Sequence, residues 1–281
     1  MSHIEGRNQN VNMSTVADHQ SGGSSFGPDD QPGSVGAGQM PEVLRANYRM
    51  RLAADNKDLR AAQLLRFVVF NLELREGLEQ SYATCLDADA YDSVCDHLLV
   101  EDMRTGEVIG TYRLQTGQRA AENRGYYSAQ EFDFTPFEPL RHEIVELGRA
   151  CVHSDHRSLT VLSLLWKGIA QYVTKRGCRY LVGCSSLTSQ DPGVGIAAYH
   201  ELQRYLVEEP WRTNPLPEFA CLGGEPPTAA PKIPKLLTMY LMLGARICGP
   251  PALDREFKTI DFLTFMDLHS LSPKTIARYF T

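Results

Sequence analysis

The sequence of 281 residues lacks several features that would assign it to a large class of proteins. It has no run of about 18 apolar residues and no apolar signal-peptide core near its start, so we expect a cytoplasmic protein. It also has no basic excess, because its formal net charge is −6. Nucleic-acid binding is therefore not expected, since duplexes are bound by a concentrated basic face.

Metal-ligand spacing is absent as well. The seven cysteines form no Cys-x-x-Cys pair, which favours reduced core residues over disulfides or metal ligands. The histidines His97, His153, His156 and His200 also lack ligand spacing. We therefore expect no metal and no bound cofactor.

Composition divides the chain into two parts. Residues 1–40 are rich in Ser, Gly, Asn, Gln and Asp, which predicts disorder, and Ile4-Glu5-Gly6-Arg7 resembles a protease site left by an expression vector. Residues 41–281 are expected to form one domain. Within this domain, residues 210–250 combine a proline-rich irregular segment with a short apolar helix predicted at 236–243.

The periodicity of apolar residues predicts an α/β fold. An amphipathic helix is expected over 59–73, and a hairpin is expected from strands 97–100 and 108–114. A strand over 144–152, a polar loop, a helix carrying Val161 to Val173 and a strand over 180–184 form a βαβ-type unit. A last strand is predicted over 257–266, with a short helix near Pro273.

Charged residues interrupt these apolar patterns. Glu146 and Arg149 lie within a strand-like run, on opposite faces unless a bulge at Gly148 brings them together. Arg66 and Arg113 also interrupt apolar stripes, with Asp92 and Asp96 as candidate counter-ions. Buried ion pairs with a structural role would explain these residues, but such a concentration of buried charge favours a polar ligand site.

A family resemblance rests on several motifs taken together. Leu65-Arg66-Phe67-Val68-Val69-Phe70, Tyr91-Asp92, Tyr112-Arg113-Leu114 and Glu146-Leu147-Gly148-Arg149 resemble the signature of acyl-homoserine-lactone synthases, which have the fold of the Gcn5-related N-acetyltransferase (GNAT) superfamily. The chain resembles still more closely the ornithine acyl-ACP N-acyltransferases, often labelled hemolysin-like. Their motifs are similar to Cys95-Asp96-His97-Leu98-Leu99-Val100, Gly125-Tyr126-Tyr127-Ser128, Glu131-Phe132-Asp133, Cys151-Val152-His153 and Gly249-Pro250-Pro251.

The resemblance implies a GNAT-like mixed, splayed central β-sheet flanked by helices, with a C-terminal extension. The thioester would lie between the splayed strands. The donor phosphopantetheine would be held near Cys151, Val152, Arg157 and Ser158. Here the chain has Arg157-Ser158-Leu159-Thr160-Val161-Leu162 in place of a glycine-rich turn, which favours acyl carrier protein over coenzyme A as the thioester carrier.

For catalysis we expect Glu146 to take a proton from the attacking amine, with Arg149 orienting it. Backbone N–H groups of residues 150–152 would stabilise the oxyanion. Arg66, Arg113 and Asp92 or Asp96 would hold the amino acid's carboxylate and ammonium groups. Tyr199 stands where many superfamily members place a general acid, although a tyrosine on a helix is more often a packing residue.

Two surfaces have alternative interpretations. A basic group could dock the acidic carrier protein, or could be a solvated helix face; it comprises Arg157, Lys167, Lys175, Arg176 and Arg179. The apolar segment 231–247 could wall a tunnel for the acyl chain, rest on the inner face of the membrane, or belong to the core.

The predicted function is that of a bacterial N-acyltransferase that moves a (3-hydroxy)fatty acyl group from acyl carrier protein to L-ornithine, giving lyso-ornithine lipid. The alternatives are acylation of another amino acid such as glycine or tyrosine, a lactone synthase, which the C-terminal extension disfavours, and a non-enzymatic acyl-carrier-binding protein.

Overall fold

The computed structural model describes residues 40–224 and 230–279. The disorder predicted for residues 1–40 lies outside the described residues, apart from Met40, which is buried. The described residues belong to one compact unit. None of the helices in these two ranges is both long enough and apolar enough to cross a membrane.

A nine-stranded sheet organises this unit, in the order β1-β2-β3-β4-β5-β6-β9-β7, with β8 paired to β9. The pair β5 and β6 is parallel and the other pairs are antiparallel, so the predicted mixed sheet is confirmed. The strands are β1 (Val43–Arg45), β2 (Tyr48–Leu52), β3 (Asp96–Asp102), β4 (Glu107–Thr116), β5 (Ile144–Val152), β6 (Tyr180–Leu187), β7 (Arg246–Ile247), β8 (Ala252–Asp254) and β9 (Thr259–Asp267).

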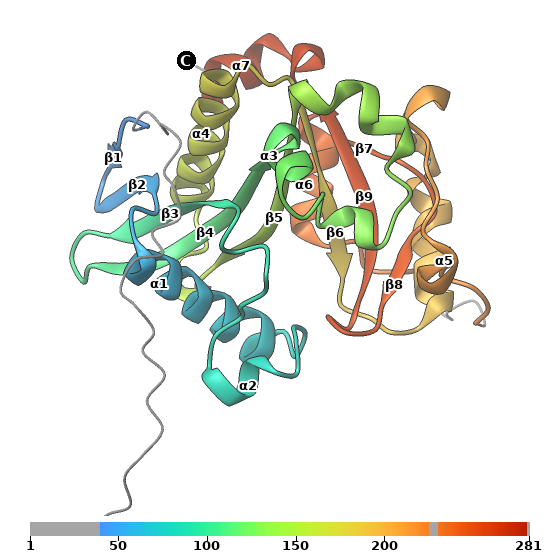
Figure 1. Cartoon of the computed structure of the whole chain (residues 1–281), viewed down its shortest axis with the longest axis horizontal. Helices are drawn as coiled ribbons and strands as arrows, with labels where there is room; N and C mark the ends of the chain where they lie inside the picture. Colours follow the sequence, from blue (N-terminus) through green and yellow to red (C-terminus); the bar gives the residue numbers. More distant parts are fainter. Residues whose placement is uncertain (1–39, 225–229, 280–281) are drawn as a thin grey trace, which may run out of the picture. The chain divides into compact units, whose positions relative to one another are not determined.

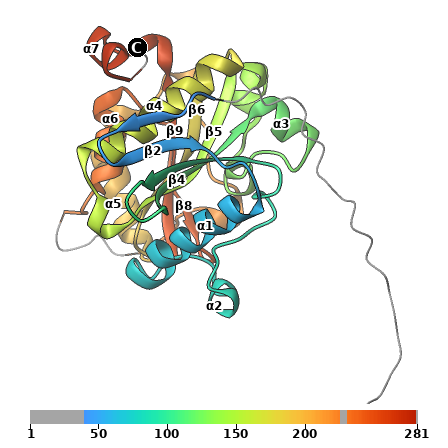
Figure 2. The same cartoon turned by 90° about the vertical axis from the view of Figure 1, so that its left-hand side faces the viewer.

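Helices cover both faces of the sheet. Figure 2 shows α4 on one face of the strands β2 to β4 and α1 on the other. Alternation along the strands explains this arrangement, because Leu98 and Leu114 pack in the α4 cluster whereas Arg113 points to the side of α1. The α-helices are α1 (Asn56–Arg66), α2 (Ser81–Thr84), α3 (Gly117–Glu122), α4 (Leu159–Arg176), α5 (Pro192–Leu202), α6 (Lys235–Leu243) and α7 (Pro273–Tyr279).

Local signals fix the long helix α4. The Ser158 side chain accepts a hydrogen bond from the Val161 N–H at its start, and Gly177 ends it in the left-handed conformation. The predicted helix over 59–73 is confirmed, but its start and the geometry of its second half differ from the prediction. It begins at Asn56 and changes from α to π geometry at Phe67, in the segment η1 (Phe67–Glu73).

The parallel strands β5 and β6 separate after a short paired start, as Figure 1 shows. Their register runs from Ile144↔Tyr180 only to Glu146↔Val182. The two backbones are close just beyond this point, because a Cβ on Gly183 would lie 2.1 Å from the Leu147 carbonyl oxygen. The implied splayed sheet is therefore present, and Glu146 stands at its vertex.

The predicted hairpin, the strand over 144–152, the βαβ unit and the last strand are all confirmed. The strands β1, β2, β7 and β8 were not predicted. Three of them, β1, β7 and β8, are two or three residues long and too short to show an alternating pattern, whereas β2 alternates over Tyr48–Leu52 and was missed.

Candidate active site

A cavity of about 330 Å³ opens between the splayed strands. Both strands line it, β5 from Glu146 to Ala150 and β6 from Leu181 to Ser186. The rest of its wall comes from η1, β4, α4, α6, β8, β9 and connecting loops. Because the cavity is walled by elements far apart in the sequence, the fold as a whole holds it in shape.

Glu146 lies at the vertex of this cavity with 5 % of its surface exposed. Its two carboxylate oxygens accept hydrogen bonds from the backbone N–H groups of Tyr127 and Ser128, both at 2.8 Å. Burial raises the pKa of Glu146 above its ordinary value, and these N–H bonds hold the rise in check. A buried carboxylate with a raised pKa is suited to taking a proton at neutral pH.

Arg149 binds residues other than Glu146, which corrects the prediction that it orients the glutamate. The β4–β5 register shifts so that Arg149 and Ala150 together oppose Tyr112. This is the predicted bulge next to Gly148, and Arg149 adopts a φ of 50° there. Among the described residues its guanidinium pairs with Asp87, at 3.4 Å, and Asp89, at 3.0 Å, and no ion pair joins it to Glu146.

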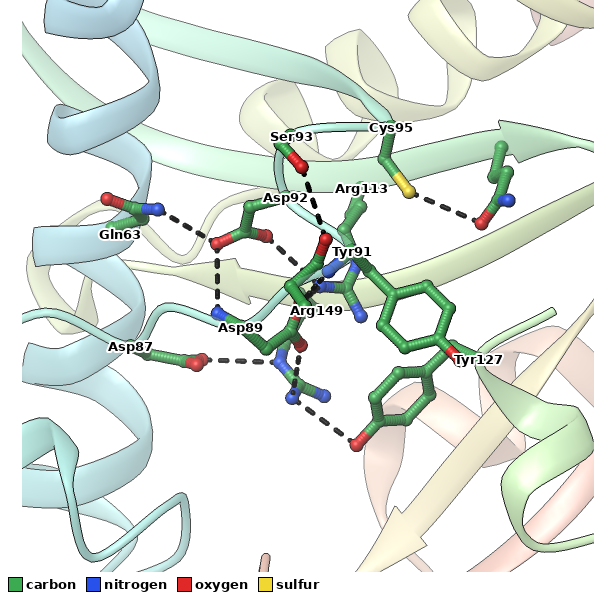
Figure 3. A network of polar contacts seen from close by, with 12 residues as sticks. Gln63, Asp87, Asp89, Tyr91, Asp92, Ser93, Cys95, Arg113, Tyr127 and Arg149 are labelled. Atoms are coloured by element: carbon green, nitrogen blue, oxygen red, sulfur yellow. Dashed lines mark hydrogen bonds and ion pairs between the residues drawn. The ribbon is translucent and has the colours of Figure 1, made fainter. Parts of the chain in front are cut away.

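Three arginines and three aspartates form a buried network beside the cavity, drawn in part in Figure 3. Arg66 binds Asp92 through both of its terminal nitrogens, at 2.6 and 3.0 Å. Arg113 donates to Asp92 at 3.0 Å and to Asp89 at 2.6 Å. Although burial opposes it, the charges of Arg66 and Arg113 hold the pKa of Asp92 below its ordinary value.

This network presents guanidinium groups to the cavity. Arg113 and Arg149 line the cavity, whereas Arg66 and Asp92 lie behind them. Tyr127 lies between the two lining arginines, with its ring centre 5.0 Å from the Arg113 guanidinium and 4.7 Å from that of Arg149 (Figure 3). The Nη2 group of Arg113 is buried and has no hydrogen-bond partner among the described residues. It is therefore available to an anionic ligand group.

Asp96 does not belong to this network, which corrects the prediction for that residue. Its carboxylate pairs with Arg119 at 3.0 Å and with Arg176 at 3.2 Å, and it accepts a hydrogen bond from the Tyr172 hydroxyl. Asp96 starts the strand β3 and therefore lies next to α3 and α4, whereas Asp92 precedes the strand and lies next to α1.

A second group of acids lines the cavity without cationic partners. Glu76, Asp254 and Asp261 are buried at its wall, and Glu131 lies behind Asp261. Within the described ranges, no Lys or Arg forms an ion pair with any of the four. Burial raises the pKa of Glu76 to about 7 and that of Asp261 to about 6. We call Glu76, Asp254 and Asp261 the acidic wall.

A metal ion is one possible ligand of this region by geometry alone. Ligand atoms of Glu131, Cys184 and Asp261 lie within 4.8 Å of one another. Burial raises the pKa of the Cys184 thiol well above its ordinary value, so this sulfur is protonated when no metal ion is bound.

The other end of the cavity is apolar. Trp166 of α4, Leu237 and Tyr240 of α6, and Phe265 and Met266 of β9 line it. The α6 helix contributes to this wall and also packs Leu237 and Leu241 into the core. Segment 231–247 therefore both lines the cavity and belongs to the core, while the acyl tunnel and the contact with the membrane stay predictions.

The remaining predicted site residues lie outside the cavity. Tyr199 of α5 packs against the apolar cluster around Leu237 and Ile260. Cys151 and Val152 follow the last lining residue of β5, Ala150. Ser158 caps α4, and Arg157 binds Glu73 through both terminal nitrogens at 2.6 and 2.7 Å.

The predicted basic docking surface is largely neutralised. Besides the Arg157–Glu73 pair, Arg176 binds Asp96 and Arg179 binds Asp267 at 2.6 Å. Three of its five cations therefore have acidic partners, which leaves little net charge to attract an acidic protein.

Several site residues were missed from the sequence. Asp87 and Asp89 lie 60 or more residues before Arg149, and the acidic wall joins residues from 76 to 261, so no local pattern connects them. A signal existed for Tyr127 and Ser128, which belong to the quoted Gly125-Tyr126-Tyr127-Ser128 motif. Two adjacent N–H groups before a 3₁₀ turn form a site for a carboxylate.

Comparisons with known proteins show what the chain is similar to. Residues 65–167 match the model of the acetyltransferase (GNAT) domain family. The L-ornithine N(alpha)-acyltransferase of Rhodobacter capsulatus is 32% identical over 240 residues, covering 81% of this chain and 93% of the relative. That of Agrobacterium fabrum is 32% identical over 246 residues, covering 82% and 84%. Among solved structures, the AHL synthase LasI aligns with a TM-score of 0.48 and 16% identity, covering 83% of this chain and 94% of that one.

Proposed function

The chain belongs to the L-ornithine Nα-acyltransferase family, and from this membership and the cavity we propose that it transfers a fatty acyl group to the α-amine of L-ornithine. The observation that carries the proposal is the position of Glu146. A buried carboxylate stands where two strands separate, between a polar end that suits an amino acid and an apolar end that suits an acyl chain.

The reaction requires deprotonation of the acceptor. An α-amine is mostly protonated near neutral pH, so Glu146 takes a proton, directly or through one water, as the nitrogen attacks the thioester carbonyl carbon. The carbon–sulfur bond then breaks, the thiolate leaves and takes up a proton, and the nitrogen keeps one hydrogen as an amide. The net change is an ammonium and a thioester converted to an amide, a thiol and one released proton.

The oxyanion of the tetrahedral intermediate would be stabilised by β5. Beyond Glu146 this strand has no β6 partner, so alternate backbone N–H groups on that edge are free to donate, and we assign residues 150–152 to this role. The same edge would receive the thioester, and Cys151, Val152, Arg157 and Ser158 would lie near the donor's phosphopantetheine at the start of α4.

The polar end would hold the rest of the acceptor. Arg113, with its unpaired Nη2, would bind the amino acid's carboxylate. Asp87, Asp89 and Tyr127 fix Arg149 beside Arg113. The role of Arg149 would thus be to position the acceptor and not to orient Glu146. Arg66 and Asp92 set the position of Arg113 from behind.

We further propose acyl carrier protein as the donor, because no glycine-rich turn precedes α4 to admit a pyrophosphate. The product would then be a lyso-ornithine lipid. Contact with the membrane's inner face would occur through α6, where Met242 is 81% exposed. Sedimentation with anionic liposomes tests the contact, and a Met242→Ser variant that sediments as well as the parent protein would contradict it.

The test of the function is an assay of the purified protein with 3-hydroxyacyl and plain acyl carrier protein, and separately with the coenzyme A thioesters. The acceptors are L-ornithine, glycine and L-tyrosine, and the products are identified by mass spectrometry. We expect Nα-acylornithine. Thioester hydrolysis with every amine, and no amide, would refute the proposal.

A further inference from the structure

The cavity has more carboxyl groups than are needed to take a proton from the α-amine. Glu146 alone faces that task, yet three more buried carboxyl groups, Glu76, Asp254 and Asp261, line the same cavity. They are separate from the network of three arginines and three aspartates, in which the charges balance. The cavity lining therefore has more acidic groups than basic ones.

These acids form one electrostatic group. Besides burial, the charge of Asp261 raises the pKa of Glu76, and the charge of Asp254 raises the pKa of Asp261. Besides burial and Glu131, the charges of Asp261 and Glu146 both raise the pKa of the Cys184 thiol. The acidic wall and the carboxylate at the vertex therefore surround the same space. An acceptor whose α-amine meets Glu146 would thus carry its side chain to the acidic wall.

Asp261 has the least satisfied carboxylate of the three. It is 4% exposed and lines the cavity, and its Oδ1 atom has no hydrogen-bond partner among the described residues. Glu76 accepts a hydrogen bond from the Thr188 hydroxyl, and Asp254 accepts the backbone N–H groups of Glu256 and Phe257 at 2.8 Å. The side chains of Ser186, Thr259 and Glu131 lie next to Asp261 but leave its Oδ1 unpaired. A buried carboxylate oxygen without a donor is rare unless a ligand supplies one.

We propose that Asp261, with Glu76 and Asp254 beside it, binds a second ammonium group at the far end of the acceptor's side chain and so selects a diamino acid. This inference rests on the proposed function and deepens it. An ammonium has three donors and no acceptor, which suits a wall made only of carboxylates. An acceptor with the same carbon skeleton and no side-chain amine would leave these acids buried and unpaired, which is the strongest basis for rejecting it.

The test compares L-ornithine with L-norvaline, which has the same carbon chain without the terminal amine. For the unaltered protein, kcat/KM should favour ornithine by at least about 10- to 100-fold, the value of one charge-assisted hydrogen bond. Asp261→Asn should reduce this preference by about the same factor, mainly through KM for ornithine, and should leave norvaline unchanged or improved. Glu76→Gln should act in the same direction.

Asp267→Asn is the matched control, because Asp267 lies on the same strand, pairs with Arg179 at 2.6 Å and does not line the cavity. Its ornithine-to-norvaline ratio should stay that of the unaltered protein. Equal use of the two acceptors by the unaltered protein, which needs no variant to fold, would overturn the inference. An equal loss for both acceptors in Asp261→Asn would also overturn it.

Two further outcomes are distinguishable. If a chelator abolishes the preference for ornithine and a divalent cation restores it, the acids hold a metal and the inference is wrong. If thioester is hydrolysed with no amide from either acceptor, the proposed function fails, and the inference fails with it. Amide formation without preference removes the inference alone.

Discussion

Glu146→Gln tests the proposed base most directly. General-base catalysis typically contributes about 10²- to 10⁴-fold, so kcat should fall by that factor, which corresponds to about 3–5 kcal/mol of activation free energy. The substitution keeps the side chain's shape. Initial rates of amide formation from acyl carrier protein and L-ornithine measure the effect, with Glu143→Gln as a control because Glu143 is exposed three residues earlier in the chain.

Loss of structure must be separated from loss of chemistry. The glutamine oxygen can accept only one of the two 2.8 Å bonds from Tyr127 and Ser128, because the amide nitrogen would face the other N–H group. This mismatch costs about 1.5–3 kcal/mol, partly offset because a charge is no longer buried. We expect the free energy of unfolding to fall by less than about 3 kcal/mol, and urea unfolding monitored by fluorescence checks this.

The pH dependence distinguishes a base from a positioning group. As the pH rises, a larger fraction of the α-amine is already neutral, and the variant needs the missing base less. The ratio of parent to variant kcat/KM should therefore shrink steadily from about pH 7 to pH 9. A ratio that is constant across this range, or a variant within about threefold of the parent at pH 7, would refute Glu146 as the base.

Three other predictions concern the surroundings of the cavity. Asp92→Asn should destabilise the protein by about 3–5 kcal/mol in urea unfolding, because it leaves Arg66 and Arg113 buried with a neutral partner. Gly183→Ala should lower both Tm and activity, since its Cβ would lie 2.1 Å from a β5 carbonyl oxygen, whereas Gly148→Ala, with open space around the added carbon, should leave Tm unchanged. Burial raises the pKa of Glu76 to about 7, above that of an unfolded chain, so the folded state binds the proton more tightly. Glu76 alone should lower the stability by about 3 kcal/mol as the pH rises from about 4.5 to 7, and Glu76→Gln should remove that part of the pH dependence in urea titrations.

Segments with a regular apolar period, and the residues that begin and end them, were predictable from the sequence. The strand 144–152 and the helix that follows it have long apolar patterns bounded by Ser158 and Gly177, so local preference and burial agree there. The bulge beside Gly148 was predictable for the same reason, because two charges of one strand had to be reconciled with its alternation.

Partner choice among charged residues was not predictable. Asp92 and Asp96 are four residues apart, yet the start of β3 directs Asp96 to Arg119 and Arg176 and leaves Asp92 to Arg66 and Arg113. The prediction that Arg149 orients Glu146 was wrong for a related reason. The left-handed backbone at Arg149 turns its guanidinium to the loop that carries Asp87 and Asp89, which sequence distance conceals.

The separation of β5 from β6 explains why the polar groups gather at this place. A parallel strand pair normally satisfies the backbone N–H and C=O groups of both edges, and here that pairing stops at Glu146↔Val182. Beyond that point the facing backbone edges of the two strands are not paired with each other. The Nη2 of Arg113 and the Oδ1 of Asp261 likewise have no hydrogen-bond partner among the described residues. An acyl thioester with an amphoteric acceptor offers a carbonyl oxygen, a carboxylate and ammonium groups to these positions. On the proposed function, a substrate of this chemistry would recover the cost in stability of keeping the cavity polar.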